Sequence, residues 1–194
     1  LNVGVKGIVN VLDGVRKQRV RRLFVASSSE VYQTPPTLPT PETVSLSIPD
    51  PYNPRYSYAG SKIISELMAL FCAPRETVVF RPHNVYGPDM GYDHVIPELC
   101  NKIRAAMGFR TEEPLPIVIQ GTGDETRSFC FIDDCIDALL LLREFGPRRA
   151  IYNIGAEDRI SIRVLLQMLG AVAGRKLAPV ASSLRGGAAP HRWP

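Results

Sequence analysis

Three side chains that can act together on an alcohol stand in two nearby stretches of the sequence. Ser28 follows the apolar run 23–26, and Tyr58 and Lys62 are four residues apart in the segment 58–71. If the run is a buried strand and the segment a helix, Tyr58 and Lys62 share one helical face near the strand end. The lysine ammonium then favours the phenolate, which can take a proton from a hydroxyl group while Ser28 hydrogen-bonds the developing carbonyl. The trio predicts oxidation of an alcohol, with hydride leaving the same carbon.

The order of motifs is more specific than the tyrosine–lysine spacing, which is common on solvated helices. The stretch 27–32 reads Ser-Ser-Ser-Glu-Val-Tyr, a proline-rich segment follows, and 56–62 reads Tyr-Ser-Tyr-Ala-Gly-Ser-Lys. This order resembles the extended short-chain dehydrogenase/reductase family, the NAD-dependent nucleotide-sugar epimerases and dehydratases. The resemblance implies that Ser28, Tyr58 and Lys62 are the catalytic residues.

The same resemblance implies NAD as the cofactor and a set of residues that contact it. These are Ala26, Ser27, Tyr58, Lys62, Pro82 and His83. For His83 taken alone, a packed and hydrogen-bonded histidine is the stronger interpretation.

A nucleotide-sugar substrate is implied by further segments. Residues 81–88 read Arg-Pro-His-Asn-Val-Tyr-Gly-Pro and resemble the point where the family's chain turns towards the sugar, so Asn84 joins Ser28 as a substrate contact. In 121–129 the resemblance places Arg127 on the diphosphate, which a guanidinium fork suits. A surface ion pair with the neighbouring acids is the alternative for Arg127. Arg192, in a tail similar to the family's, is a weaker candidate.

The hydrophobic pattern predicts an α/β fold: a partial Rossmann-like, doubly wound parallel sheet and part of a smaller C-terminal substrate lobe. Residues 1–90 are assigned to the cofactor half, and 91–194 mainly to the substrate lobe, with strands returning to the sheet. The proline-rich stretch 33–54 is a long loop of the kind that carries function.

The expected elements of the first half are a helix near 3–12, strands at 23–26 and 77–80, and the tyrosine helix. The second half is expected to hold helices at 93–107 and 160–173, and strands at 116–121, 126–132 and 150–155. A further helix is expected after 132, capped by Asp133 or Asp134.

Two departures from the family's pattern leave room for a different function. No G-x-G-x-x-G turn occurs, and Gly4 stands where the family often has asparagine. At roughly 30 residues per βαβ unit, about 60 to 90 residues are expected ahead of Leu1. A catalytically silent fragment or interaction module is therefore the alternative to an enzyme.

Glu30 keeps the reaction class open. The resemblance favours a 4-epimerase acting at sugar C4, similar to UDP-glucose 4-epimerase, by a narrow margin. Ser-Ser-Glu-Val-Tyr also resembles 4,6-dehydratases and UDP-glucuronate decarboxylases, in which this glutamate acts as acid or base at C5. Glu30 is accordingly a fourth catalytic candidate.

Composition and charge limit the classes of partner that are expected for this chain. The net charge of +4 comes largely from short basic clusters such as 16–22, which is interpreted as a solvated helix end and not as a nucleic-acid site. No apolar run is long enough to span a membrane, and the four widely spaced cysteines favour reduced thiols in the cytoplasm. No metal site is predicted, and a homodimer is possible by resemblance to the family.

Overall fold

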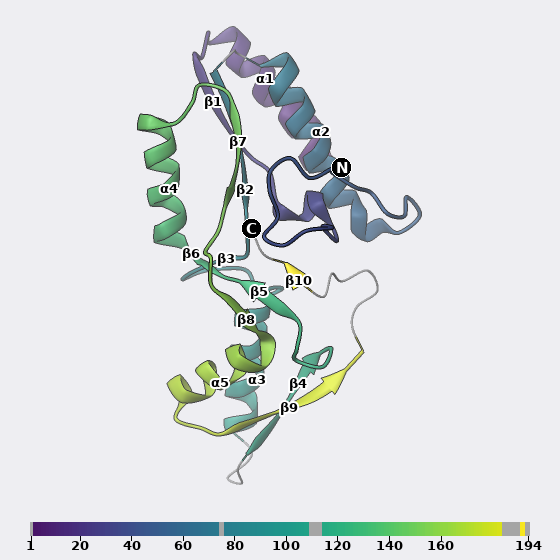
Figure 1. Ribbon diagram of the computed structural model, residues 1–194, viewed down its shortest axis with the longest axis vertical. Coiled ribbons are helices and arrows are strands. Elements are labelled where there is room, and N and C mark those ends of the chain that lie inside the picture. The colour runs from purple at the N-terminus through teal and green to yellow at the C-terminus, as the bar shows by residue number, and fades with distance from the viewer. Residues whose placement is uncertain (1, 74–75, 109–113, 184–190, 193–194) are drawn as a thin grey trace.

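The computed structural model describes residues 2–73, 76–108, 114–183 and 191–192. Figure 1 shows two parts along the long axis of the molecule: a parallel sheet flanked by helices, and a smaller set of helices and strands below it. The long connection 33–54 lies beside the sheet, close to the level where the two parts meet.

The larger part is built on a three-stranded parallel sheet. Its order is β1 (Arg22–Ala26), β2 (Glu76–Pro82) and β7 (Ala150–Ile154). Val25 pairs with Val79, and Phe80 pairs with Tyr152. Because the strands are parallel, their carboxyl ends meet at one edge, where ligands bind in sheets of this kind.

Helices cover both faces of this sheet. The π-helical turn η1 (Asn2–Lys6), α1 (Gly7–Lys17) and α2 (Ser57–Cys72) lie on one face, and α4 (Ile132–Phe145) lies on the other. The first face has a core of Ile8, Leu12, Val25, Ala69 and Val79. The second has a core of Cys130, Cys135 and Ile154. The predicted α/β class with a parallel sheet is confirmed.

The smaller part has a core of its own. It contains α3 (Val95–Met107), β4 (Leu115–Gln120), α5 (Ile162–Ala173) and β9 (Leu177–Ser182). Alternate residues of β4 are buried, and they join the core Leu99, Ile103, Ile117, Ile119, Ile162, Leu165 and Leu166. The predicted division near residue 90 stays a prediction. After that point, α4 and β7 return to the larger part and pack there.

Short elements connect the two parts. They are β3 (Val85–Tyr86), β5 (Thr126–Ser128), β6 (Cys130–Phe131), β8 (Arg159–Ser161) and β10 (His191–Arg192). Two 3-10 turns, η2 (Ser29–Tyr32) and η3 (Pro54–Tyr56), flank the loop 33–54.

The single strand expected at 126–132 is wrong. The chain changes partner at Phe129, since β5 pairs with β8 whereas β6 pairs with β3. The expected cap is also wrong: α4 begins at Ile132, so Asp133 and Asp134 lie inside its first turn. Their charges there still complement the positive end of the helix dipole.

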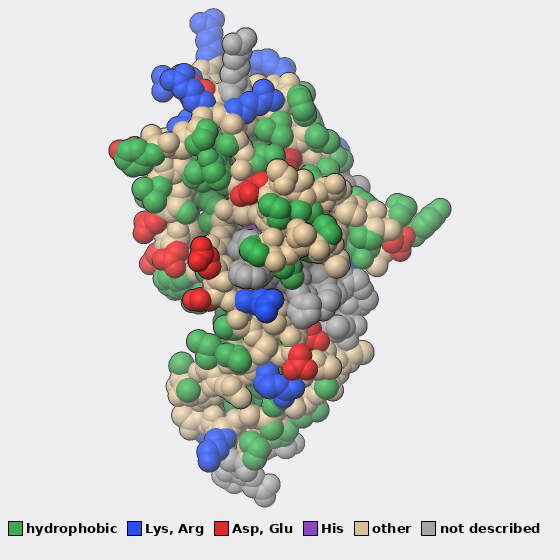
Figure 2. All heavy atoms as spheres, viewed as in Figure 1, with side chains coloured by type: hydrophobic (Ala, Val, Ile, Leu, Met, Phe, Trp, Pro, Cys, Tyr) green, Lys and Arg blue, Asp and Glu red, His purple; other side chains and the backbone are tan. Residues whose placement is uncertain are grey.

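The basic cluster 16–22 divides into two kinds of residue. Figure 2 shows Lys and Arg side chains gathered at the top of the molecule, over the end of α1 and the start of β1, and residues 16–21 are exposed as expected. Arg22 differs. Its guanidinium donates to the carbonyl oxygens of Leu142 and Gly146 at 3.1 Å each and of Pro147 at 3.2 Å, and also to that of Arg143. It therefore caps the C-terminus of α4.

Within the described ranges, no helix is both long and apolar enough to cross a membrane. The same residues contain no group of three or more side chains suited to hold a metal ion.

Candidate active site

The carboxyl ends of β1 and β2 open into a cavity of about 500 Å³ beneath Tyr58 of α2. Its lining consists of Ser28, Ser29, Glu30, Arg55, Tyr58, Pro82, Asn84, Val85 and His94. We call it the first hollow. Five predicted site residues line this one space: Ser28, Glu30, Tyr58, Pro82 and Asn84.

Local structure fixes the serine and glutamate at the rim of the first hollow. Ser28 is the N-cap of η2, and its hydroxyl oxygen accepts a hydrogen bond from the backbone N–H of Glu30 at 3.2 Å. Serine is a preferred cap because its oxygen satisfies an otherwise unpaired amide. The same turn therefore presents both side chains at the strand end.

Lys62 lies one helical turn from Tyr58, as the spacing predicts. Its ammonium nitrogen is 5.7 Å from the centre of the Tyr58 ring and donates to the Ala26 carbonyl oxygen at 2.9 Å. Burial lowers the pKa of Lys62, because a partly dehydrated ammonium releases its proton more readily. Tyr58 itself is 51% exposed.

A second hollow, of about 410 Å³, adjoins Tyr58 on the side of η1 and α1. It is lined by Val3, Gly4, Ile8, Val11, Val25, Ala26, Ser57, Tyr58, Ser61, Lys62 and Ser65. Ala26, Tyr58 and Lys62, three of the residues predicted to bind the cofactor, are among them. Tyr58 is common to both hollows.

Close packing explains the glycine at position 4. A Cβ atom there would lie 2.6 Å from both the Cβ and the Oγ of Ser61, so only glycine lets η1 approach α2 so closely. Ser61 in turn donates to the Tyr58 carbonyl oxygen at 2.7 Å. The departure from the family's pattern at Gly4 thus has a structural cause.

Ser27 and His83 lie apart from both hollows. Ser27 is buried, and its hydroxyl donates to Glu66 of α2. His83 is 2% exposed and packs with its ring centre 6.3 Å from that of Tyr32. Alternate residues of an extended chain point in opposite directions, so Ser28 faces the hollow when Ser27 faces the interior. The contact of Ser27 and His83 with the cofactor stays a prediction, and both side chains are buried.

Two smaller hollows continue from the first towards Arg127. The nearer, of about 190 Å³, shares Asn84, Val85 and His94 with the first hollow. The farther, of about 250 Å³, shares Arg127 with the nearer one and Arg55 with the first. Together they form a groove from Tyr58 to Arg127.

Asn84 and Arg127 both line the nearer hollow. Asn84 has a φ of 39° and donates from its side chain to the Ser128 carbonyl oxygen at 2.8 Å, which ties β2 to β5. The backbone of Arg192 lies beside that of Arg127 in the parallel pair β10–β5. The Arg192 side chain falls outside the described structure, so its role stays a prediction.

Glu125 holds the turn that carries Arg127. Its carboxylate accepts the backbone N–H groups of Thr122 at 3.0 Å and Gly123 at 2.9 Å. Burial acts to raise the pKa of Glu125, but these hydrogen bonds and the charge of Arg127 outweigh it and lower the pKa. Asp124 pairs instead with Arg163 at 3.5 Å. Glu125 therefore shapes the turn, and the charge of Arg127 favours its ionised form.

Four functional candidates were missed by the sequence reasoning. Arg55 and His94 line the first hollow, and a search of charged residues next to the Tyr58 motif could have found Arg55. The other two, Arg81 of β2 and Glu66 of α2, form a buried ion pair. Their signal was a charge within an apolar strand and another on an apolar helix face, positions that charged residues rarely occupy unless paired.

The sequence of this chain matches the profile of a known enzyme family. The profile of the NAD dependent epimerase/dehydratase family matches residues 1–155, so the chain belongs to this family.

The relatives act on nucleotide-linked sugars, according to their names. The chain is 36% identical over 182 residues to dTDP-4-dehydro-6-deoxy-D-allose reductase of Streptomyces bikiniensis, covering 90% of this chain and 53% of that one. It is 30% identical over 175 residues to GDP-L-fucose synthase of Sinorhizobium fredii, covering 86% and 54%. The chain thus spans about half the length of the curated relatives it matches.

Solved structures share the fold over nearly the whole chain. RMD from Pseudomonas aeruginosa complexed with NADPH superposes with a TM-score of 0.80 at 26% identity, covering all of this chain and 64% of that one. UDP-N-acetylglucosamine 4-epimerase from Methanobrevibacter ruminantium M1 gives a TM-score of 0.81 at 21% identity, covering 99% and 60%. The Rossmann-like fold is therefore shared.

Proposed function

We propose that this chain carries the catalytic centre of an NAD-dependent nucleotide-sugar enzyme that moves hydride at sugar C4, as a 4-epimerase does. One observation carries the proposal: Ser28 and Tyr58 line one hollow, with the Lys62 ammonium 5.7 Å from the tyrosine ring. Family membership, and relatives named for epimerase and reductase chemistry, support it.

The second hollow suits the nicotinamide end of the cofactor. Val3, Ile8, Val11 and Val25 offer apolar walls to a flat ring, and Lys62 offers N–H donors to ribose hydroxyl groups. When bound, the nicotinamide supplies the hydride acceptor and donor.

Each catalytic side chain has a distinct task. Tyr58, reaching both hollows, takes the proton of the C4 hydroxyl and later returns it. Lys62 favours the phenolate by its charge. Ser28 donates a hydrogen bond to the oxygen as it becomes a carbonyl.

The groove beyond the first hollow suits the rest of a nucleotide-sugar. A sugar placed under Tyr58 directs its diphosphate along the groove towards Arg127, whose guanidinium can hold phosphate oxygens. Asn84, lining both spaces, is positioned to contact the sugar. A homodimer stays a prediction.

A second candidate reaction is favoured by two charged residues in the first hollow. Glu30 there can act as the base that removes the C5 proton in a dehydration, or as the acid that protonates C5 after CO2 has left in a decarboxylation, and Arg55 can pair with the carboxylate of a uronic acid sugar. The dehydratase and decarboxylase alternatives therefore persist beside the epimerase.

The test uses the complete protein with UDP-glucose, UDP-glucuronate and dTDP-glucose, and follows both nicotinamide absorbance and products. Tyr58→Phe should lower kcat by about 10²- to 10⁴-fold, the usual contribution of an acid–base group. Tyr52→Phe is the matched control, because Tyr52 is 94% exposed and lies outside both hollows. Equal turnover in Tyr58→Phe, or wild-type protein that binds no nicotinamide, would favour the silent alternative.

Glu30→Gln separates the two reaction classes. Epimerisation at C4 needs no acid or base at C5 and should persist. Elimination of water, which needs the C5 proton removed, should stop, and a decarboxylation should lose the acid that protonates C5. Product analysis of the variant against the wild type decides between them.

A further inference from the structure

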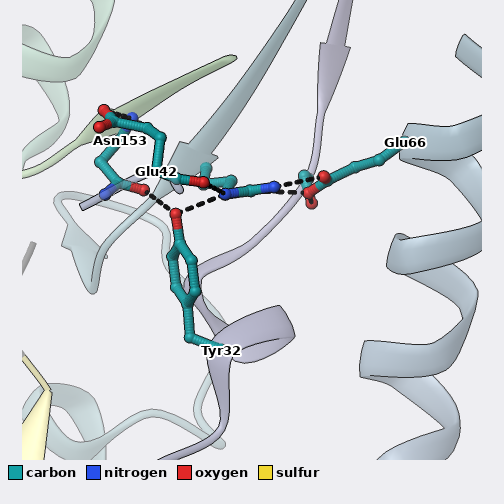
Figure 3. Close-up of polar contacts among 6 residues, drawn as sticks. Tyr32, Glu42, Glu66 and Asn153 are labelled. Atoms are coloured by element: carbon teal, nitrogen blue, oxygen red, sulfur yellow. Dashed lines mark hydrogen bonds and ion pairs between the residues drawn. The ribbon is translucent and has the colours of Figure 1, made fainter. Parts of the chain in front are cut away.

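A buried ion pair joins the helix of Tyr58 to the central strand. Arg81 of β2 and Glu66 of α2 each have side chains 2% exposed. The guanidinium Nη2 and Nε donate to the two carboxylate oxygens at 2.6 and 2.9 Å, a bidentate contact. Figure 3 shows Glu66 reaching this contact from its helix, with Tyr32 pointing into the same network.

The ion pair holds both ends of the segment that carries Ser28 and Glu30. On one side, the Ser27 hydroxyl donates to Glu66, while the Ser27 N–H donates to the Phe80 carbonyl at 2.8 Å. On the other side, the Tyr32 hydroxyl accepts from Arg81, and the guanidinium lies 4.8 Å above the Tyr32 ring. Ser28 and Glu30 lie between these anchors.

The same network fastens the loop 33–54. Arg81 donates to the Glu42 carbonyl oxygen at 3.0 Å, and the Tyr32 hydroxyl donates to the Asn153 side-chain oxygen at 2.9 Å. Asn153 of β7 in turn donates from its backbone to the Glu42 carboxylate at 2.8 Å (Figure 3). Its side chain donates to the Thr40 carbonyl oxygen at 2.7 Å. Arg81 and Asn153 therefore tie the loop to β2 and β7 together.

Stability alone is a weak reason for such a pair. Burying two charges costs free energy that their attraction offsets only in part, and apolar residues of similar volume are often as stabilising. What apolar residues cannot supply is the set of directed hydrogen bonds to Ser27, Tyr32 and Glu42. The two charges are therefore needed to fix the geometry of residues 27–32.

We propose that Arg81 and Glu66 are positioning residues that hold Ser28 and Glu30 facing Tyr58, acting through Ser27 and Tyr32. The expected effect on turnover rests on the proposed function. The expected effect on how firmly residues 27–32 are held does not. Neither residue lines the first or the second hollow. Their removal should therefore spare cofactor binding.

The main variant is Arg81→Met/Glu66→Leu, which removes both charges and keeps the volume. A displacement of about 1 Å can lower rates about 100-fold, so kcat should fall by about 10- to 100-fold while KM for the cofactor stays unchanged. The control is Arg16→Met/Asp13→Ala, which removes an exposed ion pair of α1. Wild-type kcat in the main variant would overturn the proposal.

Hydrogen exchange gives a readout that does not depend on activity. The amides of Glu30, Val31 and Gln33 bond within the segment, to the Ser28 hydroxyl, the Ser28 carbonyl and the Glu30 carbonyl. These amides should exchange at least about 10-fold faster in the main variant, while amides of α5 keep their rates. If wild-type protein turns over no nucleotide-sugar, the proposed function fails, and this exchange pattern alone decides the positioning.

Two milder variants keep the test decisive if the main variant does not fold. Ser27→Ala and Tyr32→Phe each remove one anchor and leave the ion pair in place. Each should lower kcat and speed exchange in the segment, less than the main variant does. Wild-type kcat and exchange in both would refute the positioning role.

Discussion

A methyl group at position 4 measures how closely η1 packs against the catalytic helix. In Gly4→Ala the new Cβ lies 2.6 Å from the Cβ and Oγ of Ser61. Carbon atoms in contact ordinarily lie about 3.5–4.0 Å apart, so η1 and α2 must separate by about 1 Å. Overpacking of this kind costs about 1–3 kcal/mol. Because Ser61 bonds to the Tyr58 carbonyl, the displacement reaches the turn that carries Tyr58.

Urea unfolding of the chain, followed by circular dichroism, checks this value. Gly4→Ala should lower the free energy of unfolding by about 1–3 kcal/mol with an unchanged m-value. Gly14→Ala is the matched control, since a Cβ at this position in α1 meets nothing within 4 Å. That variant should gain up to about 1 kcal/mol, because alanine favours helix over glycine.

A second background distinguishes steric overlap from other effects of alanine. Ser61→Gly removes both overlapping atoms, so adding Gly4→Ala to it should cost little. Equal losses in the two backgrounds, or wild-type stability of Gly4→Ala itself, would refute the packing argument.

Three further predictions concern charged groups. Arg127→Ala in the complete protein should raise KM for the nucleotide-sugar at least about 10-fold, since charge-assisted hydrogen bonds contribute about 1.5–3 kcal/mol, with KM for the cofactor unchanged; steady-state kinetics checks both. Arg22→Met should lower the free energy of unfolding by about 1–3 kcal/mol by uncapping α4, whereas Arg16→Met, on an exposed pair, should stay within about 0.5 kcal/mol. The pKa of Glu125 is lowered from 4.5 in the folded chain, so its stabilisation is complete above pH 4.5 and is lost as pH falls through the folded pKa. Acid unfolding of Glu125→Gln should lack this loss.

The sequence predicted the parts of the fold that depend on local pattern. The apolar runs 23–26 and 77–80 are strands, as continuous apolar runs predict for a parallel sheet. The run in the central strand β2 is largely buried, whereas Val25 is the buried residue of the run in β1. The Tyr58 helix follows from its apolar spacing, and Gly174 ends α5 in the left-handed conformation expected of a helix-terminating glycine.

The remainder depended on partners far away in the sequence. Arg22 reads as one more basic residue of a solvated cluster, yet its acceptors lie 120 residues or more along the chain. The break between β5 and β6 likewise arises because two different sheets compete for one extended segment. Neither outcome is visible in a window of neighbouring residues.

The catalytic candidates divide in the same way. Tyr58 and Lys62 were predicted together because i and i+4 meet on any helix. Ser27 was assigned to the cofactor by its neighbourhood, but Glu66 engages its hydroxyl. Arg55 enters the site only because the loop that precedes it folds back over the strand ends.

The charged side chains of the two hollows favour the placement of the two ligands that is proposed above. The first hollow carries Glu30, Arg55 and His94, groups that can hydrogen-bond a sugar with several hydroxyl groups. The second combines valine and isoleucine side chains with three serines and has Lys62 as its charged member, which suits a flat ring attached to a ribose. The reverse placement would put a nicotinamide against the three ionisable side chains of the first hollow. In the proposed function, Tyr58 lines both spaces, so its hydroxyl would take the proton of the sugar alcohol next to the place where hydride would pass directly from the sugar carbon to the nicotinamide.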